Sequence, residues 1–505
     1  MRTAFSVDQV RRAEAALMAQ LPEGELMQRA VAGLVASCVR HLGGRVYGKR
    51  VVVVAGSGDN GGDALYAGAR LARRGAVVEA VLLDEARAHS GGLAALRASG
   101  GRAANAADWT FGGAELVLDG VVGIGGRGGL RPAAAAVFAQ VERARRAPGT
   151  GPILLAVDIP SGVDSDNGEV TGPAVRADVT VTFGTHKPGL LISPGAEHVG
   201  ALEFVDIGLT PHLEGEPVLQ ALEAQDVQAL LPTASAESNK YRRGVVGVVA
   251  GSTRYPGAAV LATGSALRSG AGAVRFVGES EVSAGVLAQY PEVLIGAGRV
   301  QSWVVGPGIG LDDGGQVAAA LAEQVPVLVD ADGLAALPHP VHRPHPTLIT
   351  PHAGEAARLL GDPWTPERVE ATRLAVVLEL VARTGCTVLL KGSTTLVAEP
   401  GNPTVRVNPT GTPALATAGS GDVLSGLAGG LLATGRTAYD AGSVAAYLHG
   451  AAARELLRER PGRQIIAGDL VEVLTAGAVG TTPEPARRGT AATPSTPPRA
   501  PRSTR

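Results

Sequence analysis

A chain of 505 residues is long enough for two or more domains, each with its own hydrophobic core. Charged residues make up 18% of the chain and the formal net charge is −2, which favours neither nucleic acid nor a membrane surface as a partner. Two cysteines, Cys38 and Cys386, are too few for a disulfide framework or a thiolate metal site. Residues 1–6 lead into a predicted helix capped at Ser6 and lack the apolar core of a signal peptide. We therefore expect a cytoplasmic protein.

The first part of the chain predicts a strand, a glycine-rich turn and a helix, in the order typical of dinucleotide-binding units. An amphipathic helical region, residues 7–42, precedes a buried strand at Val51–Ala55, which runs into the glycine-rich turn 56–63. A helix is expected over Ala64–Arg74 and a second strand over Ala76–Leu83. This order fits the Gly-x-Gly-x-x-Gly template, so a dehydrogenase is one interpretation. Against it, Asp59 and Asp63 would repel a pyrophosphate unless a cation lay between them.

Oxygen-bearing side chains also follow two later predicted strands. Asp119 lies near the end of one strand, and Asp158 and Ser161 follow the next. Because the carboxyl ends of parallel strands meet at one crevice, we expect these residues to share a site with Asn60. Hard oxygen ligands suit an alkali or alkaline-earth cation better than a soft metal. The alternative is that the aspartates only cap loops at the strand ends.

Four segments together make this half similar to the YjeF N-terminal family, the NAD(P)H-hydrate epimerases: residues 59–63, 119–130, 157–166 and 182–190. The resemblance implies a Rossmann-like three-layer sandwich that interconverts the R and S forms of hydrated NAD(P)H and binds potassium. It implies that potassium is held by Asn60, Asp119 and Ser161. It implies substrate contacts from Asp59, Asn60, Gly61, Gly62, Asp63, Gly123, Ile124, Gly125, Gly126, Arg127, Gly128, Gly129 and Asp158. Asp158 is the proton-transfer candidate, because epimerising a hydroxyl-bearing carbon needs a group that gives and takes protons; Lys187 is expected to tune this carboxylate or to meet a phosphate.

Composition changes after residue 210 and predicts a domain boundary. Prolines and small polar residues gather over 211–239, which we interpret as a linker with one helix near Ala221–Leu231. A second domain is expected over 240–480, where strands alternate with helices and predict a mostly parallel sheet covered on both faces. Its strands are expected at Val245–Ala250, Ala273–Val277, Trp303–Gly306, Val325–Asp330, Thr347–Thr350 and Thr387–Leu390. Residues 481–505 are rich in Pro, Thr, Ala and Arg and are expected to form a disordered tail.

The strongest feature of this half is the glycine-rich turn 416–426, which delivers Asp422 and enters an apolar helix. Gly419 and Gly421 would let backbone amides approach an anion, and the positive end of the helix would face it. A plain alternative is a helix start capped by Ser420. Lysine is rare in this chain: of 45 basic residues only four are lysines, Lys49, Lys187, Lys240 and Lys391, which indicates that a compact ammonium is needed where one remains.

Five segments in order make this half resemble the YjeF C-terminal, or carbohydrate kinase-like, family of ADP-dependent NAD(P)H-hydrate dehydratases in the ribokinase superfamily: 255–258, 306–310, 350–355, 391–392 and 419–424. The resemblance implies a ribokinase-like α/β/α domain that uses ADP and magnesium. It implies that adenine nucleotide is bound by Lys391, Gly392, Ser393, Thr394, Thr395 and Gly421, and hydrated dinucleotide by Ala258, Gly308, His352 and Asp422. Asp422 would be the catalytic base that deprotonates the hydrate's hydroxyl for attack on the terminal phosphate of ADP.

Both resemblances converge on one metabolite, so the leading hypothesis is a bifunctional repair enzyme. It would epimerise NADHX and NADPHX, the hydrated forms of NADH and NADPH, and dehydrate the S form with ADP, giving NAD(P)H, AMP and phosphate. One alternative is a ribokinase-type kinase of a small alcohol; another makes the first half a non-catalytic nucleotide-sensing module. We expect no nucleic acid or membrane partner, and a homo-oligomer.

Overall fold

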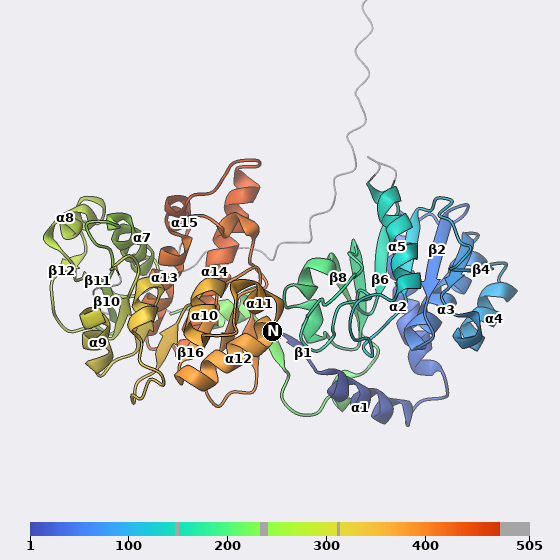
Figure 1. Cartoon of the computed structure of the whole chain (residues 1–505), viewed down its shortest axis with the longest axis horizontal. Helices are drawn as coiled ribbons and strands as arrows, with labels where there is room; N and C mark the ends of the chain where they lie inside the picture. Colours follow the sequence, from blue (N-terminus) through green and yellow to red (C-terminus); the bar gives the residue numbers. More distant parts are fainter. Residues whose placement is uncertain (147–150, 233–240, 311–313, 475–505) are drawn as a thin grey trace, which may run out of the picture.

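The computed structural model describes residues 1–146, 151–232, 241–310 and 314–474. Within these residues the strands form two sheets, one of seven strands and one of eleven. The sheets belong to two halves that lie side by side, with the N-terminus between them (Figure 1). The predicted tail, residues 481–505, lies outside the described residues. No helix in the described ranges is both long and apolar enough to cross a membrane.

The first sheet has the order β4-β3-β2-β5-β6-β7-β8, and each neighbouring pair is parallel. Its strands are β2 (Arg50–Ala55), β3 (Val77–Leu82), β4 (Arg102–Asn105), β5 (Leu116–Gly120), β6 (Ile153–Val157), β7 (Val179–Phe183) and β8 (Ala201–Val205). The helices of this half are α1 (Val7–Met18), α2 (Glu25–His41), α3 (Asp59–Arg73), α4 (Ser90–Ala98) and α5 (Pro132–Arg145). Short 3₁₀ turns are η1 (Glu85–Arg87), η2 (Pro188–Leu190), η3 (Gly195–His198) and η4 (Thr210–His212).

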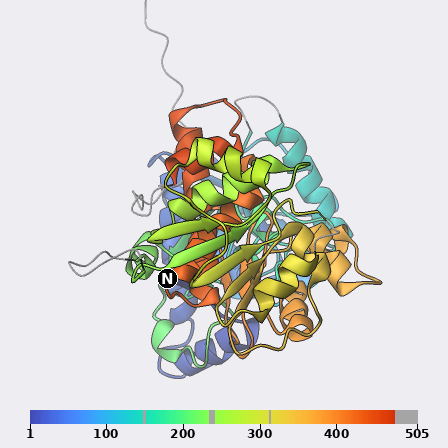
Figure 2. The same ribbon diagram turned by 90° about the vertical axis from the view of Figure 1, so that its left-hand side faces the viewer.

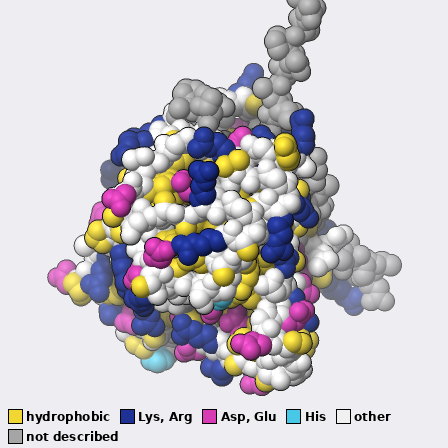
Figure 3. Space-filling view, turned by 90° about the vertical axis from the view of Figure 1, so that its right-hand side faces the viewer, with side chains coloured by type: hydrophobic (Ala, Val, Ile, Leu, Met, Phe, Trp, Pro, Cys, Tyr) yellow, Lys and Arg dark blue, Asp and Glu magenta, His cyan; other side chains and the backbone are white. Residues whose placement is uncertain are grey.

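Alternation along β2 shows why this half has three layers. Val53 faces a core that includes residues of α2, α3 and α4, whereas its neighbour Val54 faces a separate core that includes residues of α5. A parallel sheet must bury both faces, and the run of valines in β2 meets that requirement. The Rossmann-like three-layer arrangement expected from the sequence is confirmed. On its outer side this half carries basic and acidic side chains interspersed (Figure 3), as the near-neutral composition predicts.

The second sheet has the order β1-β9-β18-β17-β16-β15-β14-β13-β10-β11-β12. The pairs from β12 to β16 are parallel, whereas β17 is antiparallel to both of its neighbours. Its strands are β1 (Arg2–Ala4), β9 (Leu219–Ala221), β10 (Val245–Val249), β11 (Ala273–Phe276), β12 (Leu294–Ile295), β13 (Ser302–Val305), β14 (Val327–Val329), β15 (Thr347–Ile349), β16 (Thr387–Leu390), β17 (Leu396–Ala398) and β18 (Val405–Val407). All six strands predicted for the second half from its sequence are therefore present, with ends shifted by up to two residues.

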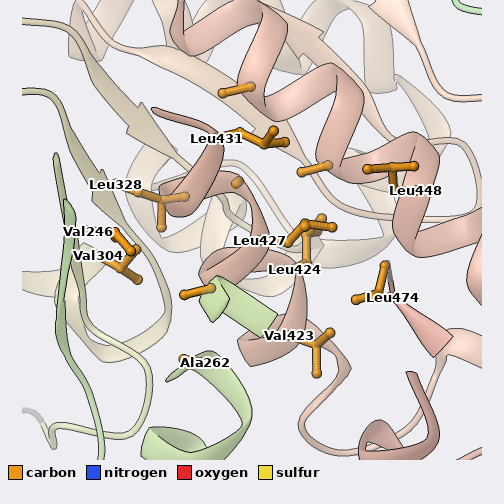
Figure 4. Close-up of a cluster of buried hydrophobic side chains, with 14 of the residues drawn as sticks. Val246, Ala262, Val304, Leu328, Val423, Leu424, Leu427, Leu431, Leu448 and Leu474 are labelled. Carbon is orange, nitrogen blue, oxygen red and sulfur yellow. The ribbon is translucent and has the colours of Figure 1, made fainter. Parts of the chain in front are cut away.

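Helices cover both faces of this sheet as well, and Figure 2 views the sheet from its far end. They are α6 (Ala224–Leu230), α7 (Pro256–Leu267), α8 (Ser280–Gln289), α9 (Gly314–Ala322), α10 (Ala353–Leu360), α11 (Pro366–Ala371), α12 (Arg373–Thr384), α13 (Ser420–Ala433), α14 (Ala438–Glu459) and α15 (Ala467–Val473), with turns η5 (Ala331–Ala336) and η6 (Pro413–Leu415). Val304 packs with α7, α13 and α14 in the core drawn in Figure 4, whereas the next residue, Val305, packs on the other face with α9, α10 and α12.

The sheets do not follow the expected domain boundary at residue 210. Strand β1, at the very start of the chain, pairs antiparallel with β9, and β9 pairs with β18 in the second sheet. The segment 211–239, interpreted above as a linker, thus supplies β9 to the second sheet, followed by α6; residues 233–239 lie outside the described ranges. Local sequence could not reveal β1, because a three-residue strand is defined by its partner rather than by its own periodicity.

Helix α13 approaches α7 closely at Gly426. A Cβ at this position would lie 2.0 Å from the carbonyl oxygen of Ala262 and 2.2 Å from Ser265 Oγ. Only glycine fits this contact without displacing backbone. The close packing that positions the N-terminus of α13, and Asp422 with it, therefore requires glycine at position 426.

We predict that Gly426→Ala destabilises the protein by about 1–3 kcal/mol, because overpacking at a helix contact outweighs the helix propensity gained. Gly468→Ala is the matched control, since a Cβ there meets nothing within 4 Å and the residue also lies in a helix. Urea unfolding of the full chain would measure both variants. An unchanged midpoint for Gly426→Ala would show that α7 and α13 separate freely.

Candidate active sites

The carboxyl ends of the first sheet border a cleft with a volume of about 1490 Å³. Most of the substrate residues predicted for this half line it: Asp59, Asn60, Asp63, residues 123–129 and Asp158. Gly61 and Gly62 lie instead in the packed start of α3, where a Cβ would come within 2.3 Å of Gly56 O and 2.8 Å of His89 Cδ2, respectively. Their absent side chains let the helix approach the loop.

Helix α3 begins five residues earlier than the sequence predicted, at Asp59 rather than Ala64. The amide of Gly62 already donates to the carbonyl of Gly58 at 3.1 Å, so the glycine-rich stretch completes the first helical turn. A pattern with two neighbouring glycines predicts a loop, but here tertiary packing imposes a helix. Asn60 and Asp63 consequently lie on the buried side of a helix N-terminus.

Asp158 lies directly after β6 and forms a buried ion pair with Lys187. The same carboxylate oxygen, Oδ1, accepts from Thr182 Oγ1 at 3.0 Å and from the amide of Phe183 at 3.2 Å. The Lys187 ammonium also donates to Thr182 Oγ1 at 3.1 Å and to the Phe183 carbonyl at 3.0 Å. Asp158 has a φ of 65°, a conformation that a non-glycine residue adopts only when its surroundings enforce it. The expectation that Lys187 acts on this carboxylate is consistent with these contacts.

Asp119 and Ser161 lie beneath the floor of the cleft. Ser161 donates from Oγ to Asp119 Oδ1 at 2.6 Å and from its amide to Oδ2 at 2.8 Å. Burial raises the pKa of Asp119 to about 6. Asn60, on α3, lies against Gly123, because a Cβ on this glycine would be 3.2 Å from Asn60 Cβ. Asn60 Nδ2 is buried without a hydrogen-bond partner among the described residues. Asn60 and the Asp119–Ser161 pair thus lie against the same loop, since the amide of Val122 donates to Ser161 Oγ at 3.0 Å.

Two further acidic side chains in this cleft, Asp63 and Glu14, form no ion pair with another described residue. Asp63 is buried, and its Oδ1 has no hydrogen-bond partner among the described residues. Burial and the charges of Asp158 and Asp59 raise the pKa of Asp63 well above its ordinary value. Glu14, on α1, lines the same cleft, and no motif in the sequence singles it out. An unpaired carboxyl of this kind marks a place where a ligand group can bind.

In the second half, an ion pair with a buried carboxylate again lies at the carboxyl edge of the sheet. Lys391, after β16, donates to Asp330 Oδ1 at 2.9 Å, and its Nζ lies 3.7 Å from Glu355 Oε2. Asp330 Oδ2 accepts from Ser425 Oγ of α13 at 2.6 Å. Although burial opposes it, the Lys391 ammonium holds the pKa of Asp330 below its ordinary value, and the same attraction raises the pKa of Lys391.

Asp422 lies in the first turn of α13, whose N-cap residue Gly419 has a φ of 83°. Burial and the charge of Asp330 raise the pKa of Asp422 to about 6. The Cβ that Gly421 lacks would lie 3.5 Å from Lys391 Nζ, so the glycine turn, the lysine and the aspartate form one group. The cap is not Ser420, whose Oγ donates instead to the Leu415 carbonyl at 2.7 Å.

The other residues predicted for the dehydratase substrate lie on neighbouring elements. Gly308 has a φ of 65°, and a Cβ there would come within 2.8 Å of Ala258 Cβ, so these two predicted residues touch. His352 caps α10, where its Nδ1 accepts from the amide of Gly354 at 2.9 Å, and its amide donates to Glu355 Oε2 at 2.8 Å. His352 therefore has a structural task in addition to any ligand contact.

The loop after Lys391 is braced by Arg373, a residue that the sequence did not indicate. Arg373 is 1% exposed and donates to the carbonyls of Leu390, Lys391 and Thr394 at 3.1, 2.9 and 3.2 Å, respectively. Its guanidinium occupies the space that a side chain on Gly392 would need. The hydroxyl of Thr394 accepts from the amide of Ser193 at 2.9 Å, which ties this loop to the first half. Ser393 and Thr395 complete the predicted nucleotide loop.

Comparison with known proteins places both halves in described families. The family model for the YjeF-related protein N-terminus matches residues 23–189, and the model for NAD(P)H-hydrate dehydratase matches residues 246–475. The bifunctional NAD(P)H-hydrate repair enzyme Nnr of Mycobacterium tuberculosis is 50% identical over 449 residues, which cover 86% of this chain and 90% of that protein. The enzyme of the same name from Mycobacterium leprae is 48% identical and covers 90% of this chain and 94% of its own length.

A solved structure is similar to the second half. The ADP/ATP-dependent NAD(P)H-hydrate dehydratase from Bacillus subtilis, co-crystallized with ATP and Mg²⁺, is 32% identical and matches with a TM-score of 0.47. The match covers 50% of this chain and 95% of that chain.

The pKa of Asp422 leads to a prediction about stability. Because its folded-state pKa of about 6 exceeds the ordinary 3.8, ionisation of this carboxyl costs folding free energy. The cost is absent below about pH 4, grows between pH 4 and 6, and is fully present above pH 6. We predict that Asp422→Asn raises the unfolding free energy at pH 8 by about 1 kcal/mol, discounted for partial exposure, and that the gain disappears near pH 4.

Thermal melts across this pH range would measure the effect. Asp108→Asn is the control, because Asp108 is exposed and its charge should not couple to folding. A gain for Asp422→Asn that is equal at both ends of the range would contradict the electrostatic explanation.

Proposed function

The chain belongs to the family of bifunctional NAD(P)H-hydrate repair enzymes, and we propose that its two sheets carry the two reactions at separate sites. The first half interconverts the R and S forms of NAD(P)H hydrate, and the second half dehydrates the S form with an adenine nucleotide. The observation that carries this assignment is the presence, in each half, of a strand-end or helix-start carboxylate beside a lysine: Asp158 with Lys187, and Asp422 with Lys391.

At the first site, Asp158 is proposed as the group that moves a proton at the hydroxyl-bearing carbon. Its second oxygen is left for the substrate, because the Lys187, Thr182 and Phe183 contacts all converge on Oδ1. The glycine loop 123–129 and residues 59–63 border the cleft in which the dinucleotide binds, and Arg127 offers a cation for its phosphates.

Potassium fits beneath this cleft. Asp119 and Ser161 present oxygen atoms at a fully enclosed position, and Asn60 adds a buried amide whose Nδ2 has no partner in the described residues; a half-turn of this amide would bring its oxygen to that place to face an ion. A cation there would offset the cost of a buried carboxylate whose pKa is already raised to about 6. When bound, the ion would order the loops on either side of the cleft floor. Within the described residues no group of three or more His, Cys, Asp or Glu side chains is arranged for a metal.

At the second site, Asp422 is proposed to take the proton of the hydrate's hydroxyl. The hydroxyl oxygen then attacks the terminal phosphorus of ADP and AMP leaves. The phosphate ester formed on the dinucleotide next loses phosphate as the ring nitrogen's lone pair forms a carbon–nitrogen double bond. The neighbouring carbon then releases a proton to solvent, which forms the ring double bond and restores NAD(P)H. A raised pKa of about 6 suits Asp422 to this task, because it is ionised near neutrality yet basic enough to accept a proton.

Nucleotide binding is proposed for Lys391, Gly392, Ser393, Thr394, Thr395 and Gly421, and hydrate binding for Ala258, Gly308 and His352. Amides at the start of α13 face the transferring phosphoryl group. Magnesium is proposed to arrive with the nucleotide phosphates at this edge, where Asp330 and Asp332 add negative charge around Asp422, and it would neutralise phosphate charge when bound. The cytoplasmic location and the homo-oligomer expected from the sequence remain part of this proposal.

The two activities should separate by substitution. With a mixture of R and S NADHX and ADP, the unmodified protein should restore the full nicotinamide absorbance. Asp158→Asn should recover the S fraction at the normal rate and then slow by 10²-fold or more, whereas Asp422→Asn should recover nothing beyond the uncatalysed background. Rapid use of the whole mixture by Asp158→Asn would make the first half a binding module. Transfer from ATP to a small alcohol, with no recovery of absorbance, would favour a ribokinase-type kinase.

Potassium removal should affect only the first reaction. In buffers where a bulky organic cation replaces potassium at constant ionic strength, the epimerisation rate should fall at least tenfold and return on addition of potassium. Dehydration of pure S hydrate by the same protein is the internal control and should not change. Asp119→Asn should abolish the potassium response. Equal epimerisation rates with and without potassium would remove the ion from the proposal.

A further inference from the structure

The proposed epimerisation, on which this inference rests, inverts a carbon that carries a hydroxyl next to a ring nitrogen. The hydroxyl leaves from one face of the ring and water returns to the other face. Proton transfer is therefore required on both faces, and a single rigid carboxylate reaches only one of them. Asp158 is held from one side by Lys187 and by the end of β7, so it cannot follow the oxygen across the ring.

Helix α1 supplies the facing wall of the cleft. It lies below the first sheet in Figure 1, at the carboxyl ends of the strands. Glu14 and Arg11 on this helix line the cleft together with Asp158 and Lys187. A Cβ on Gly125 would lie 3.1 Å from an Arg11 guanidinium nitrogen, so the helix closes against the predicted substrate loop.

The helix is fixed at its start, which gives Glu14 a defined position. Ser6 and Gln9 form a capping box, with the Ser6 amide donating to Gln9 Oε1 at 3.0 Å. The amide of Val7 donates to Asp166 Oδ1 at 2.8 Å, which joins α1 to the loop after β6. A side chain about two turns further along is therefore presented by a rigid element.

The carboxyl of Glu14 is available for chemistry. Over the described part of the chain it has neither a hydrogen bond nor an ion pair, although Arg11 lies one helical turn away on the same face. Burial raises the pKa of Glu14, Lys187 opposes this rise, and the charge of Asp158 adds to it. Asp59 and Asp63 also line this part of the cleft, and the charge of Asp59 further raises the pKa of Glu14.

We propose that Glu14 is the second proton-transfer residue of the epimerisation and serves the ring face opposite Asp158. In one direction Glu14 donates its proton to the hydroxyl oxygen, the carbon–oxygen bond breaks and water leaves, while the ring nitrogen's lone pair forms a carbon–nitrogen double bond. Water then adds to the other face, the double-bond electrons return to nitrogen, and Asp158 takes the released proton. The reverse reaction exchanges the two roles, and solvent returns each carboxyl to its starting state.

The test uses the full chain with Glu14→Gln, which keeps the shape of the side chain and removes the exchangeable acid. We expect kcat for epimerisation to fall by about 10²-fold or more with KM changed less than threefold, in both directions of the reaction. Glu14→Asp should recover part of kcat. Asp8→Asn is the matched control, because Asp8 is an exposed acid on the same helix, outside the cleft, and should leave epimerisation unchanged.

Dehydration of pure S hydrate in the same samples reports whether each variant is folded and active at its other site. A Glu14→Gln protein that epimerises within threefold of normal kcat would overturn the proposal, as would a loss confined to KM, which would make Glu14 a binding residue. A loss of kcat that Glu14→Asp does not relieve at all would point to a positional defect and also count against it. If the unmodified protein fails to epimerise, the proposed function fails, and this outcome is distinct from the others.

Discussion

Each half of the molecule is organised around one lysine that neutralises a buried carboxylate at the carboxyl edge of a parallel sheet. Lys187 is 1% exposed and pairs with Asp158, and Lys391 pairs with Asp330, which is also 1% exposed. A lone charge in such a position costs several kcal/mol, so neither member of a pair can be removed without exposing the other to that cost. In each case the partners follow different strands, and the pair therefore holds two strand ends in register at the edge where ligands bind.

These pairs leave other acids without a full partner, and this imbalance is what gives the sites their chemistry. Asp158 and Asp330 have their charge met by lysine, whereas Asp63, Asp119 and Asp422 are buried nearby with raised pKa values. Ionising these acids costs folding free energy, and they lie at the places proposed above for substrate, cation and nucleotide. Two of the four lysines of this arginine-rich chain, Lys187 and Lys391, lie at these edges, where each compact ammonium meets a carboxylate oxygen.

Sequence reasoning succeeded where chemistry and chain order coincide. Strand ends that carry Asp119, Asp158 and Ser161 could be predicted to meet, because parallel strands of one sheet end at one edge, and the structure gathers them. It failed where a residue acts through distant partners. Arg373 comes from the start of a helix and braces a loop eighteen to twenty-one positions later, and nothing local distinguishes it from other arginines. The sequence placed the start of α3 too late for a related reason. Its glycines alone indicate a loop, and only their packing against Gly56 and His89 shows that they belong to the helix.

The N-terminal segment connects the two halves structurally, so they are not independent domains joined only by a linker. Strand β1 completes the edge of the second sheet, and two residues later α1 begins and covers the cleft of the first. Between β1 and α1, the amide of Phe5 donates to the carbonyl of His186 at 3.1 Å. Burial lowers the pKa of His186 to about 4, so this imidazole stays neutral next to the ammonium of Lys187. A cut at residue 210 would leave β1 on one fragment and β9 on the other, each with an unpaired edge. The contact of Ser193 with Thr394 would be lost as well. The order of catalytic elements along the chain is therefore modular, but the architecture that positions them is shared.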